Sequence, residues 1–230
     1  MRGNPTYLSR SKPYILAAIT LLISFKVAIW AVLGFTESFL VDDLDPYWSL
    51  GSDVTVEILG AIVMLWFVHR QYGIRGSDIG LELGWLAGLP LGPLFGLTAF
   101  FLVQFIYQIP LSLAPEWLTD RSSYDFLESY ENAPTHLKPL FFFEITVLTS
   151  ICEEILYRGI VFALLYQAFT PSMTIIISSL IFGVVHFDPE AVVIGFTLGC
   201  GFAWLREVTK SLGAPILAHM TFNSIVALSS

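Results

Sequence analysis

Two adjacent carboxylates and an arginine lie inside one of the most apolar stretches of the chain. In the segment EEILYRG, Glu153, Glu154 and Arg158 are flanked by PLFFFEITVLTSIC on one side and IVFALLYQAF on the other. A charged side chain at the centre of a bilayer costs roughly 2.5–3.5 kcal/mol, so three unpaired charges would cost on the order of 9 kcal/mol. The three side chains therefore need partners, on their own helix or on others.

The two glutamates of this segment have different expected roles. Glu154 and Arg158 are four residues apart, so they share a helix face and are expected to form a buried ion pair. Glu153 points about 100° away around the helix, toward a different neighbour, and has no cationic partner of its own nearby in sequence. An intramembrane carboxylate of this kind is a candidate functional residue. Glu144, near the start of the same segment, is expected in an interfacial, hydrated position.

Later segments supply polar companions for Glu153. FGVVHF places His186 on one helix face with Phe182, and HMTFN places His219 and Asn223 on one face of another helix. A single histidine on an apolar helix is most often a packing residue. Two histidines, an asparagine and a glutamate on three segments must converge to avoid lipid, which predicts a polar chamber within a helix bundle.

These residue types suit hydrolysis of an acyl bond, above all a peptide bond. A desolvated glutamate and a histidine can together deprotonate a water molecule, and an amide and a second histidine can donate hydrogen bonds to an oxyanion. Glu153, His186 and His219 would also make a catalytic zinc set, although the HExxH spacing is absent. A third option, Cys152 as a nucleophile, is weak because a thiol on an apolar helix ionises poorly. Neighbouring hydroxyls lack a helix-spaced histidine as base.

The composition places these residues in a membrane protein. Of the 230 residues, 55% are hydrophobic and only 13% charged, and the net charge of -8 argues against nucleic-acid binding. About 20 apolar residues cross a bilayer, which predicts an all-α polytopic transmembrane bundle of about seven spans, six to eight in total. The expected spans are residues 13–36, 51–69, 84–113, 139–168, 172–188, 190–206 and 211–229, the third interrupted at Pro90 and Pro93.

Basic residues in the connecting segments indicate an orientation. Arginines and lysines gather before the first span and after the second and sixth, whereas acidic stretches lie in the alternate loops, so the N-terminus is expected in the cytoplasm. Small residues at four-residue intervals, among them Gly88, Gly92 and Gly96 in one segment and Gly195 and Gly199 in another, predict close helix packing.

The polar motifs resemble those of the CAAX protease and bacteriocin-processing (CPBP, or Abi-like) family. EEILYR is similar to its EExxxR motif, FGVVH to its FxxxH motif and HMTFN to its HxxxN motif, in the family's order. The stretch from Gly195 to Asn223 also resembles the family's glycine-rich helix and its last motif helix, except that Lys210 stands where members often have glycine. The resemblance covers roughly residues 139–229, so residues 1–138 are expected to form N-terminal transmembrane helices and loops and residues 139–230 the catalytic helical core.

The resemblance implies an intramembrane endopeptidase similar to the type II CAAX prenyl endopeptidases. Glu153 and His186 would activate the attacking water, His219 and Asn223 would stabilise the oxyanion, and Glu154 and Arg158 would support the site. The expected mechanism uses no cofactor, with zinc bound by Glu153, His186 and His219 as the alternative. The expected partners are the bilayer and a membrane-bound protein or peptide substrate, lipid-modified if it follows the CAAX branch.

Two other functions remain open at this stage. A non-proteolytic membrane protein, acting in bacteriocin immunity or as a scaffold, could retain the same motifs without turnover. A proton or ion pathway would also use buried glutamate and histidine, although it explains Asn223 and the order of the three motifs less well.

Overall fold

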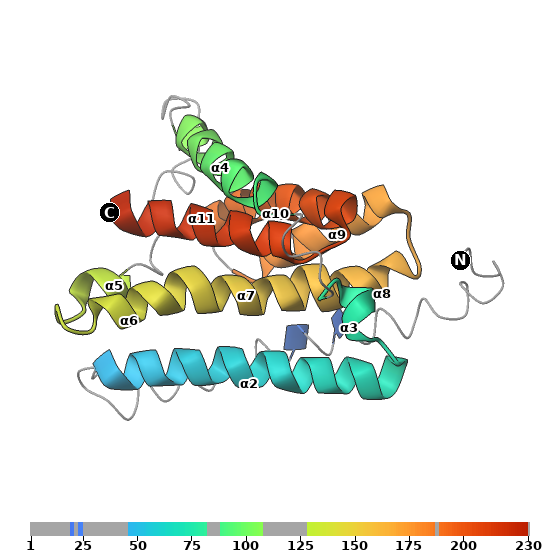
Figure 1. Ribbon diagram of the computed structural model, residues 1–230, viewed down its shortest axis with the longest axis horizontal. Helices are drawn as coiled ribbons and strands as arrows, with labels where there is room; N and C mark the ends of the chain where they lie inside the picture. The colour runs from blue at the N-terminus through green and yellow to red at the C-terminus, as the bar shows by residue number, and fades with distance from the viewer. Residues whose placement is uncertain are drawn as a thin grey trace.

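The computed structural model describes residues 19–20, 23–24, 46–81, 88–107, 128–186 and 189–229, and every regular element in these ranges is a helix (Figure 1). The all-α fold class is thereby confirmed. The longer elements are α2 (Pro46–Tyr72), α4 (Leu91–Tyr107), α9 (Pro171–Val184), α10 (Pro189–Thr209) and α11 (Gly213–Ser229), and the short ones are α3 (Gly76–Ile79) and α5 (Glu128–Asn132).

The motif EEILYRG lies on one uninterrupted helical run in which two segments are π-helical and the others α-helical. The run consists of α6 (Lys138–Phe143), η4 (Glu144–Leu148), α7 (Thr149–Glu154), η5 (Ile155–Val161) and α8 (Phe162–Tyr166), in which η4 and η5 are π-helical. We call this run, residues 138–166, the motif helix. It matches the expected span 139–168, whereas the two π-helical segments on either side of the glutamates had no counterpart in the sequence analysis. Such segments occur frequently at functional sites.

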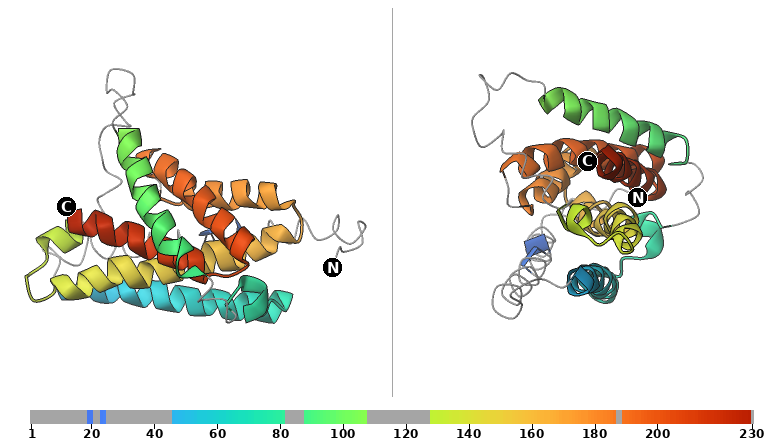
Figure 2. Two further views of the ribbon diagram at one scale, coloured as in Figure 1. Left: turned by 45° about the horizontal axis from the view of Figure 1, so that its top comes forward. Right: turned by 90° about the vertical axis from the view of Figure 1, so that its left-hand side faces the viewer.

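The other helices are layered around the motif helix. Figure 1 shows α2 running along one side of it and α11 along the other, and the end-on view in Figure 2 shows α4 as the outermost layer beyond α11. Helices α9 and α10 pack against each other, α11 contacts the motif helix through α7 and η4, and α2 contacts it through η5. The glutamates of the motif are thus surrounded by elements from both halves of the chain.

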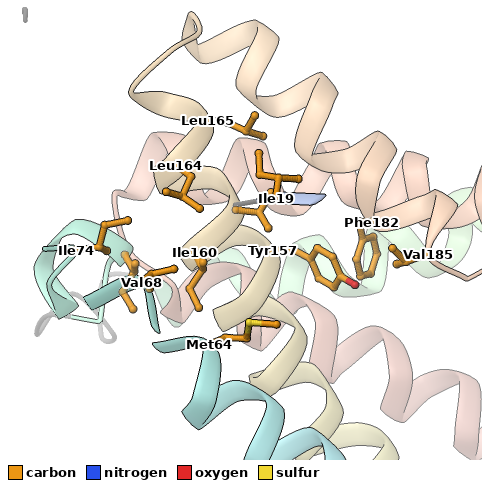
Figure 3. Packing of buried hydrophobic residues seen from close by; sticks show 12 residues of the cluster. Ile19, Met64, Val68, Ile74, Tyr157, Ile160, Leu164, Leu165, Phe182 and Val185 are labelled. Atoms are coloured by element: carbon orange, nitrogen blue, oxygen red, sulfur yellow. The ribbon is translucent and has the colours of Figure 1, made fainter. Parts of the chain in front are cut away.

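A hydrophobic cluster fills the space between α2, α9 and the second half of the motif helix (Figure 3). Figure 3 shows Tyr157 and Phe182 facing each other at one edge of it. The cluster comprises Ile19, Met64, Val68, Ile74, Ile79, Tyr157, Ile160, Val161, Leu164, Leu165, Phe182 and Val185. The helices that carry the motifs are therefore fixed on one side by a continuous apolar core.

Glycines bring pairs of helices into backbone contact, as their spacing predicted. A Cβ atom on Gly88 would lie 2.6 Å from the Ala214 amide nitrogen, and one on Gly96 would lie 2.3 Å from the Ala218 carbonyl oxygen. The Gly195 side of α10 also approaches α9, although less closely, since a Cβ there would lie 3.2 Å from the Gly183 Cα. No side chain larger than hydrogen fits at the tightest of these crossings. The predicted role of these glycines in close packing is confirmed.

Large apolar side chains cover the outward faces of α2 and α4. Trp66 is 65% exposed and Phe105 is 70% exposed. An exposed apolar surface of this kind marks contact with lipid or another apolar partner. By length and composition one described helix, Ala191–Thr209, could cross a membrane, and Leu91–Ile106 and Pro171–Val184 are shorter apolar helices.

The observed helices correspond to most of the expected spans. In the expected third span, α4 begins directly after Pro90, in agreement with a helix boundary there. The expected interruption at Pro93 is wrong, because Pro93 lies in the first turn of α4, where its missing N–H costs no hydrogen bond. The expected first span, residues 13–36, lies almost entirely outside the described residues. The number of spans, the orientation and the domain boundary at residue 138 stay predictions.

Candidate active site

Glu154 and Arg158 form the centre of a buried polar cluster. Arg158 Nη1 donates a hydrogen bond of 2.9 Å to Glu154 Oε1, and the two side chains are 1% and 0% exposed. The predicted intrahelical ion pair is confirmed. The same carboxylate oxygen also accepts a hydrogen bond of 3.0 Å from Nδ1 of His219 on α11. Glu154 therefore links two helices as well as neutralising Arg158.

Two phenylalanine rings enclose this cluster. The Arg158 guanidinium carbon lies 4.1 Å from the centre of the Phe182 ring and 5.3 Å from that of Phe202. Phe202 stacks on the His219 ring at 5.1 Å. Aromatic faces attract a desolvated guanidinium by about 0.5–2 kcal/mol. The rings therefore stabilise the buried cation from the sides that Glu154 does not reach.

The FxxxH motif holds its histidine in one tautomer. His186 Nδ1 lies 2.7 Å from the Phe182 carbonyl oxygen, and their rings meet edge to face at 5.1 Å. A carbonyl oxygen can only accept, so Nδ1 carries the hydrogen and Nε2 of the neutral imidazole has a free lone pair. A nitrogen in this state can accept a proton from water. The same reasoning applied to His219 gives Nδ1–H toward Glu154, so Nε2 donates when the ring is protonated.

Glu153 lies beside the cluster in a more open position. Its side chain is half-buried, whereas its neighbour Glu154 is fully buried. The Arg158 guanidinium also attracts the Glu153 carboxylate, more weakly than that of Glu154. Glu153 therefore has accessible surface that Glu154 lacks.

Asn223 joins the site one helical turn before the glutamates. Its Nδ2 donates to the Ile145 carbonyl oxygen at 3.1 Å and to Ser150 Oγ at 3.5 Å. Ser150 is fully buried and lies four residues before Glu154. The asparagine is therefore oriented by the motif helix, and its side-chain carbonyl oxygen takes part in neither of these two bonds.

The expectation for Glu144 was wrong. Its side chain is buried, 8% exposed, rather than interfacial and hydrated. Thr149 Oγ1 contacts Glu144 Oε1 at 3.2 Å and Glu57 Oε2, on α2, at 3.1 Å. Packing of α2 against the first half of the motif helix covers this position. The position of Glu144 near the start of an apolar run does not reveal that α2 covers it.

The residues of the alternative zinc set do not gather around one point. Among the described residues, no group of three or more His, Cys, Asp and Glu side chains is arranged to hold a metal ion. Glu153, His186 and His219 are thus not grouped as zinc ligands in this structure, and the metal-free mechanism stays a prediction.

Comparison with known proteins identifies the region that carries the site. Residues 135–225 match the family model described as type II CAAX prenyl endopeptidase Rce1-like. This region is similar to the Rce1-like family. All six predicted site residues lie within the matched region, which includes the whole motif helix, α9, α10 and most of α11.

Two curated proteins are similar to part of the chain. "Putative membrane peptidase YdiL" of Bacillus subtilis is 36% identical over 90 residues, covering 39% of this chain and 37% of that protein. "Membrane-embedded CAAX protease MroQ" of Staphylococcus aureus is 29% identical over 96 residues, covering 39% of each chain. The match thus spans about two fifths of the length of these relatives. No solved structure matches the chain.

Direct contacts join three of the six predicted site residues. Glu154 contacts both Arg158 and His219, and the Phe182 ring connects these to a fourth, His186, by contacting His186, His219 and Arg158. Sequence reasoning treated Phe182 only as a spacing marker and did not single out Phe202 or Ser150. The FxxxH motif contained the signal for Phe182. Nothing local pointed to the other two, because their contacts join residues far apart in sequence.

Proposed function

We propose that this protein is an integral membrane endopeptidase that hydrolyses a peptide bond of a membrane-associated substrate. The observation that carries the proposal is the difference between the two adjacent glutamates. Glu154 is fully buried and already binds Arg158 and His219, whereas Glu153 is half-buried on the neighbouring face. A purely structural ion pair needs only the first of these carboxylates. The match to the Rce1-like family and the peptidase relatives support the same conclusion.

The proposed reaction begins with a water molecule between Glu153 and His186. The carboxylate and the free Nε2 of His186 take up the proton as the water oxygen attacks the carbonyl carbon of the substrate. The oxyanion that forms receives a hydrogen bond from protonated His219, whose positive charge Glu154 stabilises. Asn223 Nδ2 supplies the second hydrogen bond by exchanging its 3.5 Å contact with Ser150 Oγ for the oxyanion. The C–N bond then breaks, the proton passes to the leaving amine, and a carboxylate and an amine are released.

The surrounding apolar shell accounts for the class of substrate. The site lies among helices whose outward faces are covered by exposed Trp, Phe and Leu side chains, so we propose a multi-pass membrane location with the N-terminus in the cytoplasm. A substrate that reaches such a site has its scissile bond in or next to the bilayer. A peptide carrying a lipid, as in CAAX processing, would partition to the same place.

His186→Asn tests the proposal directly. The asparagine side chain retains an N–H near Nδ1 for the Phe182 carbonyl oxygen and removes Nε2, the expected proton acceptor. General-base catalysis contributes about 10²–10⁴-fold, so cleavage of a membrane-inserted peptide by the purified protein should fall at least about 100-fold. In water enriched in oxygen-18, the wild-type product should carry one heavy oxygen in its new carboxylate.

His69→Asn is the matched control, because His69 Nδ1 makes the same kind of bond, 3.0 Å to the Ile74 carbonyl oxygen, at the end of α2. It should cleave at the wild-type rate. Equal activity of the His186 and His69 variants would contradict the proposed base. Absence of cleavage by the wild-type protein on lipidated and unlipidated peptides alike would favour the non-proteolytic alternative.

A further inference from the structure

A second buried arginine lies beyond the polar cluster, at the end of the bundle where three helices terminate. Tyr72 ends α2, Tyr166 ends α8, and Arg206 and Lys210 lie in the last turn of α10 and just after it. Together with Asp78 of α3 these residues line a cavity of about 500 Å³. None of the six predicted site residues lines this cavity, so it is separate from the candidate active site.

The cavity lies close to the site along the same two helices. Phe162 follows Arg158 by four residues on the motif helix, and Arg206 follows Phe202 by four residues on α10. Four residues are about one helical turn, or roughly 5–6 Å along the helix axis. The cavity is therefore the next layer outward from the cluster, toward the ends of the helices.

Arg206 is a buried cation without an ion-pair partner among the described residues. It is 7% exposed, and Nη2 donates to the Asp78 carbonyl oxygen at 3.2 Å. Its Nε is buried without a hydrogen-bond partner. In the described part of the chain no carboxylate oxygen lies within ion-pair distance of Arg206, and Glu207 attracts it only from farther away. A buried charge of this kind is costly unless something pairs with it.

The carboxylates of the cavity are already used or lie in water. Glu207 Oε1 pairs with Lys210 and accepts a 3.2 Å hydrogen bond from the Tyr166 hydroxyl. Asp78 is exposed, and its Oδ2 accepts the Arg75 amide at 2.8 Å. Neither neutralises the guanidinium, so the anion that does so must come from outside the described residues.

Lys210 gives a second reason to regard the cavity as a binding site. It is the one described residue other than glycine with a positive φ, 54°. Glycine adopts this conformation without the steric cost that other residues pay. Lysine at a position that favours glycine suggests that its side chain is needed. Its ammonium group lies 5.6 Å from the centre of the Tyr166 ring, at the rim of the cavity.

We propose that this cavity binds the phosphate of a membrane phospholipid headgroup. A phosphodiester accepts charge-assisted hydrogen bonds in the geometry that a guanidinium offers, and the Lys210 ammonium group at the rim provides a further donor. Headgroups lie at the level where spanning helices end, and basic cavities between helix ends are where they bind. The acyl chains would extend along the exposed apolar faces of the bundle. The assignment does not depend on the proposed hydrolysis.

Thermal unfolding of the delipidated protein in a maltoside detergent tests the assignment. We compare four additions: phosphatidylglycerol, phosphatidylethanolamine, a galactosyl diacylglycerol with the same acyl chains, and inorganic phosphate at millimolar concentration. The two phospholipids should each raise the unfolding temperature by several degrees, and the other two should not. An equal shift with the galactolipid would show that the chains alone bind, and an equal shift with inorganic phosphate would show a site for the free ion. Either result would overturn the assignment.

Two variants distinguish phospholipid binding in the cavity from attraction to exposed cations on the surface. Arg206→Gln should weaken the apparent phospholipid affinity at least about tenfold, the effect of losing one charge-assisted hydrogen bond. Arg70→Gln removes an exposed cation from the same end of α2 without touching the cavity, and its response should equal that of the wild type. A phospholipid response in Arg206→Gln equal to that of Arg70→Gln would contradict the proposal.

Ala163→Leu keeps the test decisive if Arg206→Gln fails to fold. Ala163 is half-buried and lines the cavity, so the larger side chain fills part of the space while every charged group stays in place. The phospholipid shift should fall in the same way. An unchanged shift would mean that the lipid binds elsewhere.

Discussion

Arg158 and Arg206 are both buried in an apolar helix bundle, yet their surroundings differ in kind. Arg158 is 1% exposed, pairs with Glu154 and lies against two phenylalanine rings. Arg206 is 7% exposed, reaches a backbone carbonyl oxygen and one more distant ring, that of Phe162 at 5.8 Å, and lines a cavity. The first cation is neutralised by Glu154, whereas the second has no ion-pair partner in the described part of the chain.

The difference indicates what each layer of the bundle does. A cation that is fully paired with its own helix and its neighbours holds structure in place, here the relative position of α7, α9, α10 and α11. A cation that lacks a counter-charge and borders open space is arranged for a ligand. The exposed fractions of the two side chains do not distinguish these roles, whereas their ion-pair and hydrogen-bond partners do.

Removing each arginine in turn should give the largest difference in unfolding free energy between the two regions. Arg158→Met leaves the Glu154 carboxylate buried without its counter-charge, which destabilises a protein by about 3–5 kcal/mol. Arg206→Met removes a cation with an unsatisfied Nε and should change the free energy of unfolding by less than about 1 kcal/mol. Equilibrium unfolding of the delipidated protein in a maltoside detergent, without added phospholipid, measures both. Similar losses in the two variants would show that Arg206 is a structural residue like Arg158.

The aromatic partners should give a smaller difference. Phe182→Leu and Phe162→Leu each remove a buried ring, but only Phe182 contacts Arg158 and both site histidines. Beyond the shared loss of volume, the Phe182 variant should lose about 0.5–2 kcal/mol more stability from the cation–π contact. It should also reduce peptide cleavage, because His186 loses its edge-to-face neighbour.

Phe162→Leu should leave cleavage within a few-fold of the wild type and serves as the control for lost volume. Cleavage reduced to the same extent in both variants would mean that the Phe182 ring acts only by filling space.

The sequence was sufficient for features that depend on local spacing. The Glu154–Arg158 pair follows from four-residue periodicity, and α2, α9, α10 and α11 follow from the lengths of apolar runs. The helix-packing role of Gly88, Gly92 and Gly96 follows from their four-residue repeat.

Features that depend on contacts between distant segments were not predictable. His219 reaches Glu154 across 65 residues and Arg206 reaches Asp78 across 128. The burial of Glu144 depends on α2, which no periodicity of the motif helix can reveal. The π-helical segments η4 and η5 change which residues share a face by a fraction of a turn, so a regular α-helical projection misses them.

The central claim is that the two adjacent carboxylates of the motif have separate roles: Glu153 activates water, and Glu154 stabilises the fold by neutralising Arg158. The most direct measurement is peptide cleavage and unfolding free energy in the same nanodisc preparations of Glu153→Gln and Glu154→Gln. Glu153→Gln should unfold within about 1 kcal/mol of the wild type while cleavage falls at least about 100-fold. Glu154→Gln should lose about 3 kcal/mol or more, because Arg158 remains as an uncompensated buried charge. Wild-type cleavage by Glu153→Gln, or equal destabilisation in the two variants, would contradict the account.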